Sequence, residues 1–212
     1  MKVALCLFGI VGGTAGKNGR GADVSPEIAF KHYRDHILTP NDVDVYFHTW
    51  SVNSGYDLKR LYNPADCWLQ PQELFSNDLF KHRAHSRWCS TKKSIGLVRG
   101  EYDFIMLSRF DVAFFTDVDF SRYDPEYFYA SHWNDVGNRE NHQNGFLDFW
   151  FFGGAEIMRK FGNLYDRIGS YDVSQHKAAK QHAEFIGAKI KYTMYRGEDH
   201  EMVRRAILKC KE

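Results

Sequence analysis

Short apolar runs alternate along the chain with stretches whose apolar positions recur at helical spacing. The first pattern is typical of buried strands and the second of helices that cover a sheet. Their alternation predicts an α/β fold with a central, mixed but mostly parallel sheet flanked by helices. The expected strands are residues 3–8, 43–47, 102–107, 112–115, 127–131, 148–152 and 189–195.

The helical stretches carry start and stop signals. Ser25-Pro26 places a polar N-cap before a proline at the first helical position, and Gly100 follows the stretch 86–99 as a stop. Gly153-Gly154 opens the clearest amphipathic pattern, with apolar positions from Ile157 to Ile168. Further helices are expected over residues 174–186 and 198–209, and an irregular segment with short helices over 51–78.

Composition narrows the class of protein. The 212 residues, 43% apolar and 26% charged, suit one globular domain spanning 1–212, which can also be the N-terminal part of a longer protein. A net charge of +1 without long runs of either sign argues against nucleic-acid and membrane-surface partners. Four dispersed cysteines favour reduced thiols in the cytoplasm, and no apolar run reaches the roughly 20 residues of a membrane span.

A glycine-rich loop follows the first expected strand. Ligands of open α/β sheets lie beyond the carboxyl ends of strands, and glycines allow backbone amides to approach phosphates closely. The loop lacks the known phosphate motifs, since Val11 and Asn18 replace residues that a P-loop requires. Lys17 and Arg20 favour an anionic ligand, and a loop without a binding role is the alternative. Its glycines are Gly9, Gly12, Gly13, Gly16, Gly19 and Gly21.

A polar stretch, Ser108-Arg-Phe-Asp111, lies between two apolar runs. A carboxylate at the end of a buried strand needs a partner or a metal to offset its desolvation. Mn²⁺ or Mg²⁺ would accept Asp111 together with phosphate oxygens of a bound donor. An internal Arg109–Asp111 salt bridge is the alternative.

Further candidates lie near the end of the chain and in the strand at 148–152. Asp199 could orient or deprotonate an acceptor hydroxyl, and His200 could complete a metal shell, although acidic residues also favour a helix N-terminus. Asp148 and Trp150 place a carboxylate beside an aromatic ring, a pair that can hold a sugar. A hydrogen-bonded structural role is the alternative for Asp148.

Taken in order, these pieces resemble the nucleotide-diphosphosugar glycosyltransferases of the GT-A fold. Residues 7–21 correspond to the nucleotide-binding loop, 109–111 to the D-x-D metal motif, 152–154 to the glycine turn and 197–204 to the late G-E-D helix start. The overall character is similar to the N-terminal glycosyltransferase domain of chlorella-virus capsid-glycan proteins. Arg109 replaces the first acidic residue of the metal motif, so only Asp111 carries over as a ligand.

The resemblance implies transfer of a hexose or deoxyhexose from a UDP-sugar to a carbohydrate or glycoprotein hydroxyl, with Mn²⁺ or Mg²⁺, in the host cytoplasm if the protein is viral. Asp199 or Asp148 would be catalytic, Asp111 and His200 would bind the metal, and stereochemistry stays open. A nucleotidyl- or sulfotransferase and a non-catalytic carbohydrate-binding module are the rival functions. The expected donor-binding residues are Phe8, Gly9, Gly12, Gly13, Arg20, Arg87, Lys93, Arg109, Asp111, Trp150 and Gly153.

Overall fold

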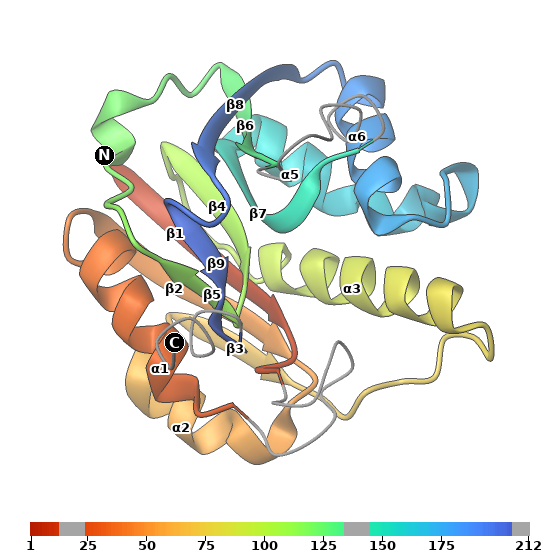
Figure 1. The fold of residues 1–212 in the computed structure, drawn as a ribbon, viewed down its shortest axis with the longest axis horizontal. Helices are drawn as coiled ribbons and strands as arrows, with labels where there is room; N and C mark the ends of the chain where they lie inside the picture. Colours follow the sequence, from red (N-terminus) through yellow and green to blue (C-terminus); the bar gives the residue numbers. More distant parts are fainter. Residues whose placement is uncertain (13–23, 134–144, 205–212) are drawn as a thin grey trace.

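A central sheet with strand order β3-β2-β1-β4-β7-β6-β8 organises the chain (Figure 1). The computed structural model describes residues 1–12, 24–133 and 145–204. Strands β3, β2, β1 and β4 are parallel, whereas β7 runs antiparallel to both β4 and β6. The mixed, mostly parallel α/β sheet expected from the sequence is therefore confirmed. The strands are β1 (Lys2–Gly9), β2 (Asp42–Thr49), β3 (Asp66–Leu69), β4 (Phe104–Arg109), β5 (Val112–Phe114), β6 (Tyr127–His132), β7 (Leu147–Gly154), β8 (Lys189–Tyr195) and β9 (His200–Met202).

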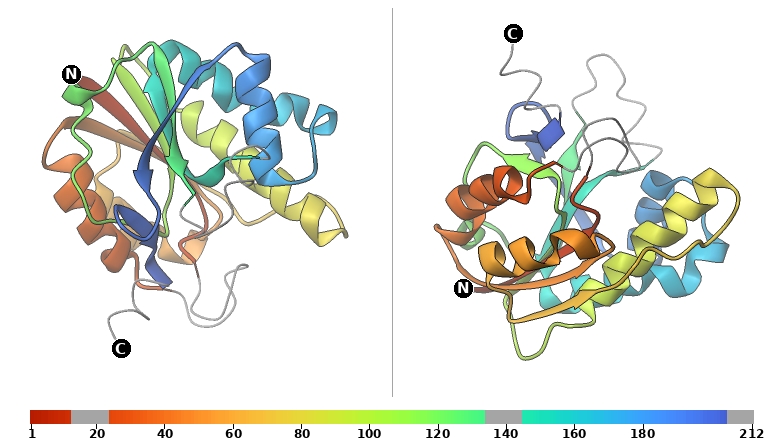
Figure 2. Two further views of the ribbon diagram at one scale, coloured as in Figure 1. Left: turned by 45° about the horizontal axis from the view of Figure 1, so that its top comes forward. Right: turned by 90° about the horizontal axis from the view of Figure 1, so that it is seen from below.

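Helices cover both faces of this sheet (Figure 2). Alternate residues of β1 divide the interior, because Val3, Leu5 and Leu7 face one hydrophobic cluster and Ala4, Cys6 and Phe8 face the other. The first cluster includes α1 and α2, and the second includes α3, α5 and α6. Burial on both faces explains why β1 is a continuous apolar run. The α-helices are α1 (Pro26–Tyr33), α2 (Gly55–Tyr62), α3 (Leu79–Ile95), α5 (Ala155–Gly162) and α6 (Gln175–Phe185). A π-helix, η1 (Arg34–Leu38), and the 3₁₀-helices η2 (Val52–Ser54), η3 (Phe120–Arg122) and η4 (Asn163–Ser170) accompany them.

Local capping sets two of the helix starts. The Ser25 side chain accepts a hydrogen bond from the Glu27 amide at 3.4 Å, so α1 begins at Pro26 as its sequence predicts. Asp78 Oδ1 accepts from the amides of Phe80 and Lys81 at 2.8 and 3.0 Å. This cap starts α3 at Leu79, seven residues earlier than the periodicity from residue 86 indicates.

The end of the described chain differs from its prediction. Residues 200–202, expected within a helix over 198–209, instead form β9, which pairs antiparallel with β5 as a separate two-stranded sheet. Pairing with buried Val112–Phe114 overrides the helical preference of this acidic stretch. Helical backbone starts no earlier than Val203. The four-residue strand β3 was also missed within the segment expected to be irregular.

The order of the strands defines one edge of the sheet as a place for ligands. From β1 the chain moves outward through β2 and β3, and it then returns to the other side of β1 to form β4. Connections from these neighbours therefore leave in opposite directions above the carboxyl ends of β1 and β4, where the last paired residues are Phe8 and Arg109. Across the described residues, no helix has the length and apolar character needed to span a membrane.

Candidate functional site

A cavity of about 710 Å³ opens beyond the carboxyl ends of β1 and β4. Its aromatic walls come from Phe8, Trp50, Phe80, Trp133 and Phe149. Its cationic side chains include Arg83, Arg87, Arg109, Arg196 and Arg204, and among the described lining residues Asp148 is the one acidic side chain. Among the described residues, the lining thus combines flat apolar surface with more arginine than acidic side chains.

Arg109 and Asp111 form a two-point ion pair at the edge of this cavity. Arg109 Nε donates to Asp111 Oδ1 at 2.8 Å and Nη2 donates to Oδ2 at 2.7 Å. The backbone between them is anchored by Tyr33, whose hydroxyl donates to the Arg109 carbonyl at 2.5 Å. Burial would by itself lower the pKa of Arg109, but the Asp111 and Asp148 carboxylates raise it above its ordinary value. The salt bridge that the sequence left as an alternative is therefore present.

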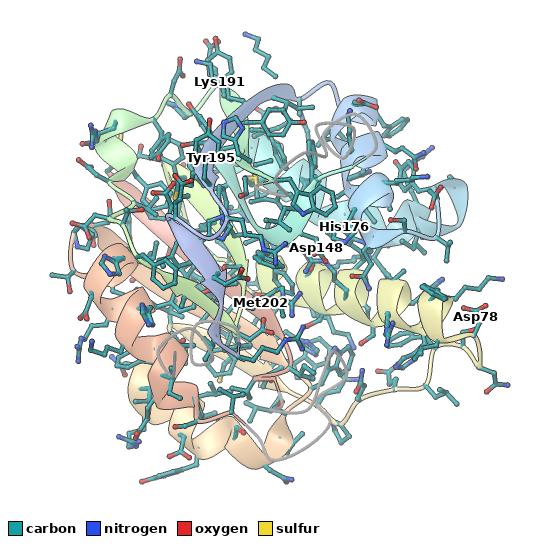
Figure 3. The ribbon with its side chains drawn as sticks, viewed as in Figure 1. Asp78, Asp148, His176, Lys191, Tyr195 and Met202 are labelled. Carbon is teal, nitrogen blue, oxygen red and sulfur yellow. The ribbon has the colours of Figure 1, made fainter. Side chains whose placement is uncertain are left out.

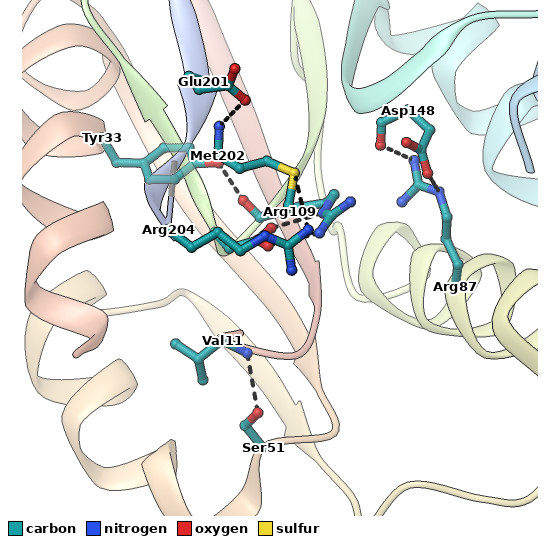
Figure 4. A network of polar contacts seen from close by, with 10 residues as sticks. Val11, Tyr33, Ser51, Arg87, Arg109, Asp148, Glu201, Met202 and Arg204 are labelled. Atoms are coloured by element: carbon teal, nitrogen blue, oxygen red, sulfur yellow. Dashed lines mark hydrogen bonds and ion pairs between the residues drawn. The ribbon is translucent and has the colours of Figure 1, made fainter. Parts of the chain in front are cut away.

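Arg87 and Asp148 form a second, fully buried pair (Figure 4). Arg87 Nε lies 3.2 Å from Asp148 Oδ2, and Nη2 donates to the Asp148 carbonyl at 2.7 Å. The guanidinium also lies 4.4 Å from the ring centres of Phe8 and Trp88. Burial is the main cause that lowers the pKa of Arg87 to about 10. Burial opposes ionisation of Asp148, yet the charges of His176, Arg87 and Arg109 lower its pKa to about 2.

His176, on the first turn of α6, faces the same carboxylate (Figure 3). Its Nδ1 lies 2.7 Å from the Phe146 carbonyl and 3.6 Å from Asp148 Oδ1. Both neighbours are acceptors, so the neutral ring carries its proton on Nδ1 and leaves Nε2 able to accept one. A side chain on Gly145 would come within 2.6 Å of the His176 backbone, so glycine permits this close approach. Sequence reasoning missed His176.

The late acidic stretch reaches the cavity through different residues from those expected. His200 is completely buried, its Nε2 lies 2.7 Å from Ser131 Oγ, and burial lowers its pKa to about 3. Asp199 accepts from the Tyr195 amide at 2.6 Å and from Thr116 Oγ1 at 3.0 Å, which stabilises the turn before β9. Neither side chain lines the cavity, whereas Arg196, Met202 and Arg204 do.

The other expected donor-binding residues divide into two groups. Phe8, Gly9, Arg87 and Arg109 line the cavity, whereas Gly12 is not among its lining residues, and an added Cβ there would be 3.3 Å from Asp111 Cβ. Gly13 and Arg20 lie outside the described residues.

The second group lies away from the cavity wall. Lys93 donates to Gln70 Oε1 at 2.7 Å and lies 5.0 Å from the Trp50 ring centre. Trp150 is buried in the core, 5.6 Å from Phe152 between ring centres. Gly153 pairs with Ile105 inside the sheet, where an added Cβ would lie 2.7 Å from the Tyr127 carbonyl oxygen. Its role in the structure is close strand packing.

Asp111 and His200 do not fit a shared metal site. Both oxygens of Asp111 accept from Arg109, while His200 is enclosed by the rings of Phe114, Phe149 and Trp150. In the β5–β9 ladder His200 pairs with Phe114, three positions along the chain from Asp111. Within residues 1–12, 24–133 and 145–204, no cluster of three or more histidine, cysteine or acidic side chains has a metal-binding arrangement.

Comparison of the chain with protein-family models and with curated proteins returned no match. The proposed function therefore rests on the residues that line the cavity.

Proposed function

We propose that this protein is a glycosyltransferase that takes a sugar from a nucleotide-diphosphate donor, a UDP-hexose or UDP-deoxyhexose, and transfers it to a hydroxyl of a carbohydrate or glycoprotein. The observation that carries the proposal is the arginine-rich, aromatic-walled cavity at the point where the strand order reverses. Open α/β sheets bind nucleotides at this point. A volume of about 710 Å³ also lies within the range of about 300–1,000 Å³ typical of small-molecule sites.

The lining matches the parts of such a donor. Guanidinium groups bind phosphate oxygens through paired, charge-assisted hydrogen bonds. The rings of Phe8, Trp50 and Phe149 offer flat surfaces for a base or for the apolar face of a sugar. A diphosphate also balances the positive charge that the described lining residues leave in excess.

The transfer requires a group that accepts a proton. The acceptor oxygen forms a bond to the anomeric carbon of the sugar, and the bond from that carbon to the diphosphate oxygen breaks, releasing UDP. His176 Nε2 accepts the proton that the acceptor hydroxyl loses, while Phe146 and Asp148 hold the opposite edge of the ring. The arginines stabilise the negative charge that grows on the departing diphosphate.

Two measurements test this function. The first is the melting temperature of the protein with UDP, GDP or CMP, and the proposal expects the largest rise with UDP. A ligand that binds the folded protein adds about 2.7 kcal/mol of stability at a hundredfold excess over its dissociation constant. UDP release from UDP-sugars should then require a carbohydrate acceptor.

The rival functions give other results. A nucleotidyl- or sulfotransferase would turn over its own donor without releasing UDP from a UDP-sugar. A carbohydrate-binding module would bind sugar without recognising any of the three nucleotides. Either result would contradict the proposal.

A further inference from the structure

We infer that Arg87, Arg109 and Arg204 form a diphosphate clamp that does the work of a divalent cation, so that the donor binds without metal. This inference rests on the proposed function and specifies how its site holds the donor. The three residues come from α3, from the end of β4 and from the position two residues after β9. All three line the cavity.

The clamp residues are close enough to affect one another. Burial first, and the charge of Arg109 among the further causes, lower the pKa of both Arg87 and Arg204. Arg109 is thus electrostatically coupled to each of the others. Figure 4 draws Arg109 and Arg204 in the same region of the network and Arg87 beside Asp148. In the described part of the chain, the carboxylates that form ion pairs with these three cations are those of Asp111 and Asp148.

Two clamp residues, Arg109 and Arg204, keep hydrogen-bonding capacity for a ligand. Arg109 uses Nε and Nη2 on Asp111, which leaves Nη1 for a ligand. Arg87 Nη1 has no hydrogen-bond partner in the described part of the chain, but the atom is buried, so Arg87 contributes its positive charge to the clamp and not a free donor. Arg204 donates to the sulfur of Met202 at 3.7 Å, and a thioether is a weak acceptor. Phosphate oxygens are stronger acceptors than a thioether, so a diphosphate would satisfy the remaining donors of Arg109 and Arg204.

In this arrangement Asp111 positions Arg109 and does not bind a metal ion. Its carboxylate, whose side chain is 7% exposed, is already neutralised by Arg109. A divalent cation at this carboxylate would displace a two-point ion pair and then face the released guanidinium. Asp111 instead fixes the orientation of Arg109, and the guanidinium groups supply the positive charge next to the leaving diphosphate.

Calorimetric titration of the full chain with UDP, once in EDTA and once in Mn²⁺, tests the clamp. The dissociation constant should agree within about threefold between the two buffers. In EDTA, Arg109→Gln and Arg204→Gln should each weaken UDP binding at least about tenfold, as expected for the loss of a charged hydrogen bond. Arg34→Gln, which removes an exposed ion pair with Asp35, is the matched control and should bind like the parent.

Further binding measurements distinguish the contribution of the clamp from that of the rest of the site. Inorganic pyrophosphate should compete with UDP in EDTA, whereas uridine binding should be unchanged in Arg204→Gln. Asp111→Asn should still bind UDP in EDTA, because the arginines remain. Circular dichroism identifies a variant that fails to fold, and Arg109 and Arg204 provide independent variants.

The possible results distinguish failure of the clamp from failure of the proposed function. Binding of UDP that needs Mn²⁺ and is lost in Asp111→Asn would overturn the clamp and leave the proposed function standing. Metal-independent binding that is insensitive to both arginine substitutions would also overturn it. No UDP binding in either buffer would instead count against the proposed function itself.

Discussion

Replacing Asp148 by asparagine removes the charge opposite Arg87 while keeping nearly the same shape. The side chains of this pair are 4% and 7% exposed, so solvent screens their interaction little. A pKa lowered from 3.8 to about 2 corresponds to a few kcal/mol, roughly 2–3, in favour of the ionised, folded form. Leaving a buried guanidinium without its partner typically costs about 3–5 kcal/mol, and the amide oxygen recovers part of this. We therefore expect the variant to be less stable by about 2–4 kcal/mol.

The assay is thermal and urea unfolding of parent and variant at several pH values. For a chain of this size the expected loss corresponds to a melting temperature lower by about 5–15 °C at neutral pH. Because the folded-state pKa is depressed, the stability that Asp148 contributes is present above pH 3.8 and lost as the pH falls from 3.8 towards about 2. The difference between parent and variant should therefore shrink over that window.

Glu156→Gln is the matched control, since it removes a solvent-exposed pair with Lys160. It should melt within experimental error of the parent. A melting temperature for Asp148→Asn within about 2 °C of the parent would refute the reasoning, because it would mean that the buried pair contributes almost nothing to the folded state.

Three further predictions follow from the same geometry. His176→Gln should lower turnover at least about a hundredfold with UDP affinity unchanged, as single-turnover and binding assays would show; equal turnover would exclude it as the proton acceptor. His200→Gln should flatten the loss of stability that the parent shows as pH falls from 6.5 towards about 3, because the buried ring is held neutral and its pKa is depressed; unchanged acid-unfolding curves would contradict this. Gly12→Ala should cost about 1–3 kcal/mol in urea unfolding, since Gly12 has φ +98° and lies against Asp111, whereas Gly169→Ala, with open space around it, should be neutral.

Sequence patterns predicted the elements whose signals are local. The apolar run of β1 and the Ser25-Pro26 start of α1 are confirmed because each depends on neighbouring residues. Strand β3 was missed because it is a four-residue strand at the edge of the sheet, and its sequence Asp-Cys-Trp-Leu does not alternate between polar and apolar residues. Strand β9 lies where the sequence predicts a helix, because its conformation is decided by pairing with β5, a partner about 90 residues earlier in the chain.

The same difference between local and long-range contacts explains which site residues could be predicted from the sequence. Phe8, Gly9 and Arg109 could be predicted because they end strands that converge at one edge of the sheet. His176 could not, since it reaches Asp148 only through the packing of α6 against the start of β7. The partner of Asp111 was stated as one of two alternatives, and only three-dimensional geometry identifies Arg109 as the group on both of its oxygens.

The reversed direction of β7 has a consequence for how this protein tolerates change. Because β7 runs antiparallel to β4, it delivers its first residues, not its last, to the cavity. A single inserted or deleted residue near its start would preserve an apolar strand yet shift Leu147 or Phe149 into the position of Asp148. Such a change would leave the hydrophobicity profile of β7 nearly the same but would remove the carboxylate between Arg87 and His176. Among descendants of this sequence, insertions and deletions should therefore be selected against at the Leu147 end of β7.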